Sequence, residues 1–180
     1  MSTSGPTPAT LGPAATQPGR EVGHVLLFAA FGLGLGAVAG VVWWAVVDLP
    51  AYQVNAAGEA ITSERGLAGQ IAGDAWFAVL GAVVGTVLGV LAWRRFGTLG
   101  WPVVLLAGLV ALAAALVCWS VGSHLGPGEL SARLAAARPG DLVPIELAVR
   151  ARAGLIIWPL FAVIPVLLAS SLGHDPADPR

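Results

Sequence analysis

Four long apolar runs, separated by polar connections, dominate the pattern of hydrophobic and polar positions along this chain. They cover residues 25–47, 75–93, 101–121 and 153–172. Each run is close to the roughly 20 helical residues that cross a hydrocarbon core about 30 Å thick. The pattern therefore predicts an all-α, polytopic membrane protein with four transmembrane helices.

The segments before, between and after these runs are polar. Residues 1–24 are rich in Pro, Ser, Thr and Gly near their start and cannot bury enough apolar surface to offset the entropy of ordering, so we predict a disordered N-terminal tail. Residues 173–180 are predicted to form a C-terminal tail. Only residues 94–100 separate the second run from the third, which predicts an antiparallel hairpin of these two helices.

The two longer connections are predicted to contain helical segments. One helix is expected to start near Glu64 and continue into the second run. The sequence GELSARLAAAR at 128–138 predicts a short helix on the membrane surface. A further helix is expected to start at Pro144 or Glu146 and to enter the fourth run directly.

Glycine recurs at every fourth position in the first two runs, which on a helix gives a stripe without side chains where another backbone can approach closely. The stripes could also line a pore or a substrate path, but small residues at this spacing more often indicate close helix packing. We therefore predict helix packing through these glycines and expect the first two helices to pack directly against one another. The segments 28–44 and 77–93 also match at 8 of 17 positions in one register, which suggests a duplication of the inverted-topology kind. The predicted packing residues are Gly32, Gly36, Gly40, Gly81, Gly85 and Gly89.

Six of the seven tryptophans lie at or near the ends of the apolar runs, as expected for the aromatic belts of a membrane protein. The six are Trp43, Trp44, Trp76, Trp93, Trp101 and Trp119. The fourth run contains two prolines, so we expect a bend there and expect neighbouring helices, or Ser170 and Ser171, to satisfy the carbonyls that the prolines release.

The composition supports the membrane assignment and limits the partners. Hydrophobic residues make up 57% of the chain and charged residues 11%, and the mean hydropathy is +0.82, which excludes an ordinary soluble domain. The net charge of −1 gives no basic excess for nucleic acid. The expected partners are the lipid bilayer and, in addition, another membrane protein or a second copy of this chain.

Arginine supplies all nine cationic side chains, which together with the abundant Ala, Gly, Val and Pro indicates a high-GC bacterial genome. Arg20 and the pair Arg94 and Arg95 favour cytoplasmic termini by the positive-inside rule. Five arginines on the opposite face argue against this orientation. We still favour cytoplasmic termini, because the 94–100 turn is too short to dilute its two positive charges. The predicted location is the cell membrane.

A few polar side chains near one membrane face are candidates for chemistry. Two carboxylates and an imidazole could bind a divalent cation or act as acid and base, although side chains at such positions are more often solvated helix ends. The candidates are Asp48, Gln70, Asp74 and His124. Cys118 is expected to be a packing residue. No cofactor is predicted.

No Asp, Glu, Lys, Arg or His lies inside the four runs, which disfavours ion-coupled transport. The glycine-rich first run ending in Trp-Trp, the Asp-Ala-Trp-Phe at 74–77 and the WSVGSHLGPGE at 119–129 resemble a family of small actinobacterial membrane proteins of unknown function. The resemblance covers most of residues 25–172 and implies four spans, but no activity.

Three functions are compatible with these patterns. The leading hypothesis is a structural or accessory component of the cell envelope without enzymatic activity. The second is a small uncoupled channel or transporter subunit. The third is a membrane enzyme that uses Asp74 and His124.

Overall fold

The computed structural model describes residues 18–47, 51–54, 60–61, 64–127, 130–138, 140–144 and 147–172. Within these residues the chain forms four long helices, each of which contains a stretch long and apolar enough to cross a membrane. They are α1 (Pro18–Val46), α2 (Glu64–Phe96), α3 (Pro102–Leu125) and α5 (Gly154–Leu172). The predicted all-α polytopic fold is confirmed.

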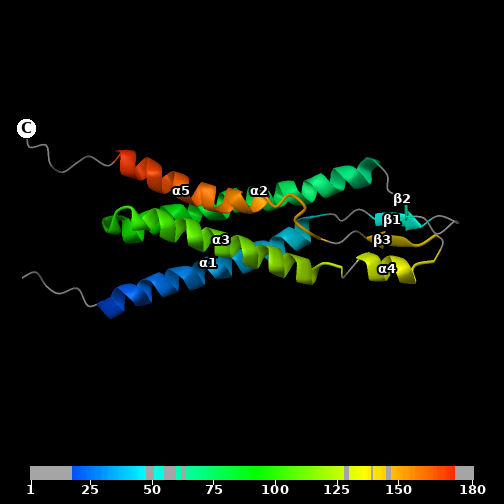
Figure 1. Cartoon of the computed structure of the whole chain (residues 1–180), viewed down its shortest axis with the longest axis horizontal. Coiled ribbons are helices and arrows are strands. Elements are labelled where there is room, and N and C mark those ends of the chain that lie inside the picture. Colours follow the sequence, from blue (N-terminus) through cyan, green and yellow to red (C-terminus); the bar gives the residue numbers. More distant parts are fainter. Residues whose placement is uncertain are drawn as a thin grey trace, which may run out of the picture.

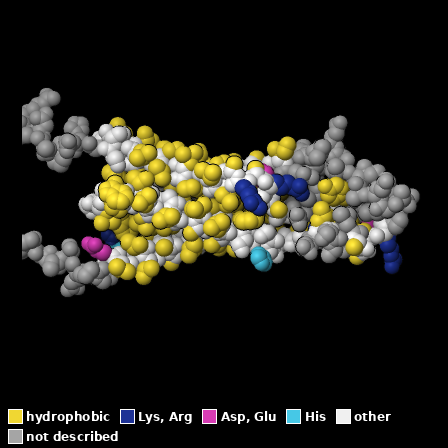
Figure 2. All heavy atoms as spheres, in the orientation of Figure 1, with side chains coloured by type: hydrophobic (Ala, Val, Ile, Leu, Met, Phe, Trp, Pro, Cys, Tyr) yellow, Lys and Arg dark blue, Asp and Glu magenta, His cyan; other side chains and the backbone are white. Residues whose placement is uncertain are grey.

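The four helices lie lengthwise in one bundle, and the beginning of α1 and the end of α5 lie at the same end of it (Figure 1). We call this the terminus end. Hydrophobic side chains cover most of the bundle on the face shown in Figure 2, and charged side chains gather at its two ends. This distribution is typical of a membrane-spanning bundle.

A small folded unit, which we call the cap, lies at the opposite end of the bundle (Figure 1). It combines a three-stranded antiparallel sheet of order β2-β1-β3 with a short helix. The elements are β1 (Ala51–Val54), β2 (Ala60–Ile61), β3 (Leu142–Pro144) and α4 (Leu130–Ala136). The strands join the two long connections, since Tyr52 of β1 pairs with Val143 of β3. The sequence analysis predicted α4 but not the sheet.

The hairpin between the second and third helices has the predicted compactness. A 3-10 turn, η1 (Gly97–Leu99), follows α2, and Gly100 adopts a φ of 71°, a left-handed conformation that suits glycine. α2 begins at Glu64, as predicted, and its 33 residues give a helix about 50 Å long, which exceeds the hydrocarbon thickness. α1 begins at Pro18, inside the segment predicted as a tail; residues 1–17 and 173–180 lie outside the described part of the chain.

The predicted start of the fourth helix was wrong. Residues 142–144 form β3 instead, and the helix begins only at Gly154. Two interactions hold this segment in a non-helical conformation: β3 pairs with β1, and the backbone N–H groups of Arg150 and Ala151 bond to a side chain of α2. These contacts come from distant parts of the chain, so the local sequence does not identify the partners of this segment.

The predicted packing of the two glycine stripes on each other was also wrong, because each stripe faces a different helix. A Cβ on Gly36 of α1 would lie 2.8 Å from the Cα of Ala114 in α3. A Cβ on Gly89 of α2 would lie 2.9 Å from the carbonyl carbon of Ala162 in α5. The bundle is therefore built from two closely packed pairs, α1 with α3 and α2 with α5.

Within each pair the two helices run parallel to each other. Along α1 and α3 the contacts advance together, from Gly36 against Ala114 to Gly40 against Cys118. Along α2 and α5 they advance from Gly85 against Trp158 to Gly89 against Ala162. Helix backbones this close allow Cα–H···O contacts, which favour association where lipid removes the hydrophobic driving force.

Two smaller expectations were wrong in part: the two serines bond to other carbonyls, and one of the belt tryptophans is buried. The hydroxyl of Ser170 bonds to the carbonyl of Val166 and that of Ser171 to the carbonyl of Leu168, whereas the prolines at 159 and 165 release the carbonyls four residues before them, at 155 and 161. Among the predicted belt tryptophans, Trp43 is fully buried. Four of the predicted belt tryptophans are exposed, as side chains of an aromatic belt should be: Trp44, Trp76, Trp101 and Trp119.

Candidate functional site

A cluster of three buried aromatic side chains fills the bundle near its cap end. Trp43 and Phe77 meet edge to face with ring centroids 5.3 Å apart, and the Phe77 and Trp158 centroids are 5.4 Å apart. Each tryptophan is seated on a glycine, Trp43 on Gly122 of α3 and Trp158 on Gly81 of α2. The cluster thus joins all four long helices, and the glycines provide the space for the two indoles.

The two buried indoles differ in their hydrogen bonding. The Nε1 of Trp43 donates to the carbonyl oxygen of Gly73 at 2.9 Å, which links α1 to α2. The Nε1 of Trp158 is buried and has no hydrogen-bond partner among the described atoms. Burying this N–H without a partner costs free energy, and no hydrogen bond of the indole offsets that cost. We therefore interpret Trp158 as a side chain held in place by packing.

Asp74 fastens the segment that returns from the cap to α5. Its two carboxylate oxygens accept the backbone N–H groups of Arg150 at 3.1 Å and Ala151 at 3.0 Å. Leu147 and Val149, just before this contact, are buried against the bundle, with exposed fractions of 4% and 9%. A charged acceptor makes stronger hydrogen bonds than a neutral one, so Asp74 anchors this segment to α2.

The polar cluster that the sequence analysis considered is only partly placed by the structure. Asp48 lies outside the described residues, as does the side chain of Gln70, whose backbone belongs to α2. Asp74 binds the Arg150 segment, and the Nδ1 of His124 lies 2.7 Å from the carbonyl oxygen of Ser120 in its own helix. Among the described residues, no group of three or more His, Cys, Asp or Glu side chains could hold a metal ion.

The sequence analysis named Asp74 and Trp43 but missed the groups to which they bond at this end of the bundle, for a physical reason. The partners are backbone groups, such as the Gly73 carbonyl and the Arg150 N–H. Almost every residue has such groups, so the amino-acid type does not reveal which of them will bond. One signal was present over residues 145–150, where Ile145, Leu147 and Val149 alternate with Glu146, Ala148 and Arg150, the two-residue period of an extended, half-buried segment. That alternation argued against the helix predicted from Pro144 or Glu146.

Cys118 lies in the interface between α1 and α3. Its side chain is fully buried, and its carbonyl oxygen would lie 2.7 Å from a Cβ on Gly40. The position fits the packing role that the sequence analysis expected of it. The thiol therefore has no route to solvent in this arrangement.

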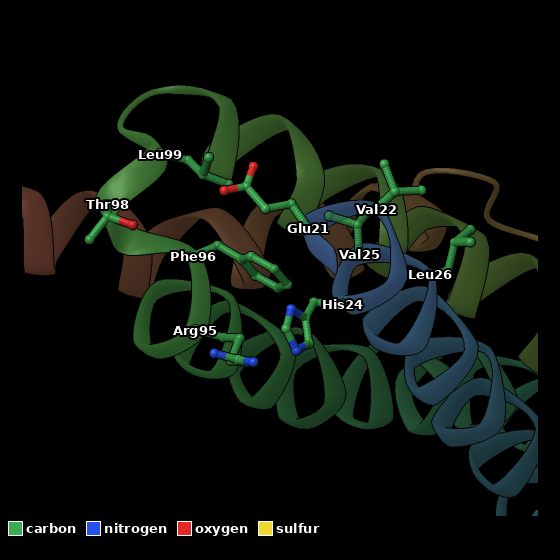
Figure 3. A pocket seen from close by; sticks show the side chains of 9 residues that line it. All are labelled: Glu21, Val22, His24, Val25, Leu26, Arg95, Phe96, Thr98 and Leu99. Atoms are coloured by element: carbon green, nitrogen blue, oxygen red, sulfur yellow. The ribbon is translucent and has the colours of Figure 1, made fainter. Parts of the chain in front are cut away.

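Two adjoining hollows lie at the terminus end, between the start of α1 and the end of α2. The first has a volume of about 510 Å³ and receives both acidic and basic side chains, and Figure 3 shows the residues that line it. The second, of about 410 Å³, lies closer to the middle of the bundle and shares His24, Arg95 and Phe96 with the first. The Phe28 and Phe96 rings, 5.6 Å apart, are buried; Phe96 lines both hollows and Phe28 lines the second one. We call these two rings the aromatic floor.

The described chain thus has two distinct features, an anchored cap at one end and a pair of lined hollows at the other. Scans of the chain against protein-family models, curated proteins and solved structures found no match in any of the three. Function must therefore be inferred from the contacts within this chain.

Proposed function

We propose that this protein is a structural or accessory component of a bacterial cell membrane, and that it acts by holding the cap in a fixed position on one face of the bilayer. In this proposal the bundle is an anchor and carries out no enzymatic chemistry. The surface offered to other envelope components belongs to the cap, including exposed residues such as Leu142, whose exposed fraction is 68%.

The observation that carries the proposal is the attachment of the cap segment to the bundle by Asp74. The two hydrogen bonds to Arg150 and Ala151 join positions 76 and 77 residues apart in sequence, and thus tie a connection to a membrane helix. The burial of Leu147 and Val149 adds apolar contact to the same junction. A unit held in this way keeps one orientation relative to the bundle.

Tight packing between the helices supports an anchor over a channel. The glycines of α1 and α2 lie against the backbones of α3 and α5, and the Trp43, Phe77 and Trp158 rings fill the interior near the cap. Protein atoms therefore fill the space between the helices along the glycine stripes. A single chain therefore serves better as a rigid support than as a passage.

We further propose that the terminus end is cytoplasmic and the cap lies outside, in the cell membrane of an actinobacterium. Arg94 and Arg95, in the last turn of α2, support this orientation through the positive-inside rule. The short turn that follows them, residues 97–99, keeps these charges close to the membrane.

The proposal is tested by site-specific photocrosslinking in native membranes. A photoreactive residue replaces Leu142 in the cap, and in a control it replaces Leu109, which is 65% exposed on the apolar α3. We expect discrete protein adducts from position 142 that are lost in Asp74→Ala and kept in Asp141→Ala, because the hydrogen bond that the structure gives the Asp141 carboxylate is a local one, to the Arg138 N–H in its own turn.

Two results would contradict this function. Adducts at position 142 that are unchanged in Asp74→Ala would show that the anchored position of the cap is irrelevant to its contacts. Selective solute flux through the purified protein in liposomes, together with no adduct at position 142, would support the channel hypothesis instead.

A further inference from the structure

We infer that the paired hollows at the terminus end bind one phospholipid whose headgroup carries both a phosphate and a primary amine, as in phosphatidylethanolamine. This inference is independent of the function proposed for the cap. It rests on the residues that line the hollows, on their depth along α1, and on which charges each hollow contains.

The inner hollow fits the upper part of an acyl chain and the phosphate next to it. Its apolar lining comes from α1 and α2, and its polar lining consists of Arg95 and His24. A guanidinium donates several N–H groups in a plane, which suits a phosphate group. No carboxylate lines this hollow among the described residues, so its charge favours an anion. The apolar lining residues are Leu27, Phe28, Phe31, Leu91 and Phe96.

The outer hollow adds an acidic side chain. Glu21 lines it together with Arg95, His24 and Thr98. In the view of Figure 3 the Arg95 and His24 side chains lie on one side of the Phe96 ring and the Glu21 carboxylate lies on the other. A headgroup with a phosphate at Arg95 and an ammonium group at Glu21 would match both charges, whereas a purely anionic headgroup would meet the carboxylate unfavourably.

The depths of these residues agree with the order of groups in a phospholipid. Along α1, Glu21 and His24 lie about 4.5 Å apart in height, and Phe31 lies about 15 Å from Glu21 toward the membrane centre. Leu27 and Phe31 are 69% and 47% exposed, so their surfaces are available to an acyl chain. The charged groups therefore occupy headgroup depth and the apolar groups acyl-chain depth.

The buried aromatic floor makes this a preformed site. The exposed fractions of Phe28 and Phe96 are only 8% and 7%, and the two rings pack edge to face. Because packing already holds these two rings in place, lipid binding would order fewer protein side chains here than at a surface of exposed side chains. The site thus differs from the general lipid contact that every membrane helix makes.

The test measures dissociation constants of single lipids for the purified full chain by native mass spectrometry. The probes are phosphatidylethanolamine, phosphatidylcholine and phosphatidylglycerol with identical acyl chains. We expect phosphatidylethanolamine to bind tightest. Arg95→Gln should weaken its binding about tenfold, while Arg94→Gln, a neighbouring arginine that lines neither hollow, should leave it unchanged.

The Glu21→Gln variant separates the amine from the phosphate. It should reduce the preference for phosphatidylethanolamine over phosphatidylglycerol and leave the affinity for phosphatidylglycerol equal or higher. Glycerophosphoethanolamine and inorganic phosphate, which lack acyl chains, should not compete at matched concentrations. Equal weakening by Arg94→Gln and Arg95→Gln, an unchanged headgroup preference in Glu21→Gln, or full competition by inorganic phosphate would overturn the inference.

A second measurement covers the case in which Arg95→Gln does not fold. A photoactivatable phosphatidylethanolamine, reacted with the unmodified protein, should label peptides of α1 around Phe31 and of α2 around Leu91. Labelling spread evenly over the exposed faces of all four helices would contradict a defined site.

Discussion

The indole N–H of Trp43 in α1 donates a hydrogen bond of 2.9 Å to the carbonyl oxygen of Gly73 in α2. The two helices belong to different glycine-packed pairs, so this bond links one pair to the other. One residue further along α2, Asp74 holds the segment that returns from the cap. The bond that links the two helix pairs and the contact that holds the returning segment therefore involve adjacent residues of α2.

The first prediction compares the two buried tryptophans. Trp43→Phe and Trp158→Phe remove the same volume from fully buried positions, but only the first removes a hydrogen bond. We expect Trp43→Phe to lower the free energy of unfolding by about 1 kcal/mol more than Trp158→Phe does. Unfolding in detergent micelles measures both variants, and an equal loss would contradict a stabilising role for the Trp43 bond.

The second prediction concerns the helix pairs and uses two glycines one half-turn apart. A Cβ on Gly36 would meet the backbone of Ala114, whereas a Cβ on Gly34 would meet no described atom within 4 Å. Gly36→Ala should destabilise the protein by about 1 to 3 kcal/mol because overpacking forces the backbones apart. Gly34→Ala should be neutral or stabilising. Similar effects from both substitutions would contradict the pairing of α1 with α3.

The third prediction concerns the accessibility of Cys118. Because its side chain is fully buried between helices, a membrane-impermeant maleimide should not label it in intact cells. Leu125→Cys in a Cys118→Ala background is the matched control, since position 125 is 45% exposed at the cap end of α3. Rapid labelling of Cys118 itself would reveal a water-filled path and favour the channel hypothesis.

The fourth prediction concerns orientation. Reporter enzymes active only outside the cytoplasm should be active when fused at residue 58, in the connection before α2, and inactive when fused at residue 98. The reason is the placement of Arg94 and Arg95 beside residue 98. The reverse pattern would overturn the orientation and leave the four spans intact.

The sequence was sufficient to predict the four spans because the bilayer, rather than a particular tertiary partner, sets the length of an apolar run. The helical start at Glu64 followed from a local signal of another kind, the potential capping residues Thr62 and Ser63 just before it in the sequence. Helix pairing was a different matter. A glycine stripe such as Gly32, Gly36 and Gly40 indicates that another helix backbone can approach closely, but it does not identify that helix. In the structure, the helix that packs on this stripe is α3 rather than α2.

Adjacent tryptophans illustrate the same limit at a single position. Trp43 and Trp44 both lie at the end of an apolar run, yet the first is fully buried and the second is 43% exposed. Their exposure differs because Trp43 packs on Gly122 of α3. The cap sheet and the Asp74 contact likewise depend on pairing between distant segments, which periodicity within one segment does not encode.

The central claim, that Asp74 fastens the cap segment to the bundle, is tested most directly by hydrogen exchange at the amides of Arg150 and Ala151. Their N–H groups should be protected in the unmodified protein and should exchange much faster in Asp74→Ala. Asp141→Ala, which removes a hydrogen bond within a local turn, should leave them protected. Exchange at these two amides that is unchanged in Asp74→Ala, or that rises equally in both variants, would contradict the claim.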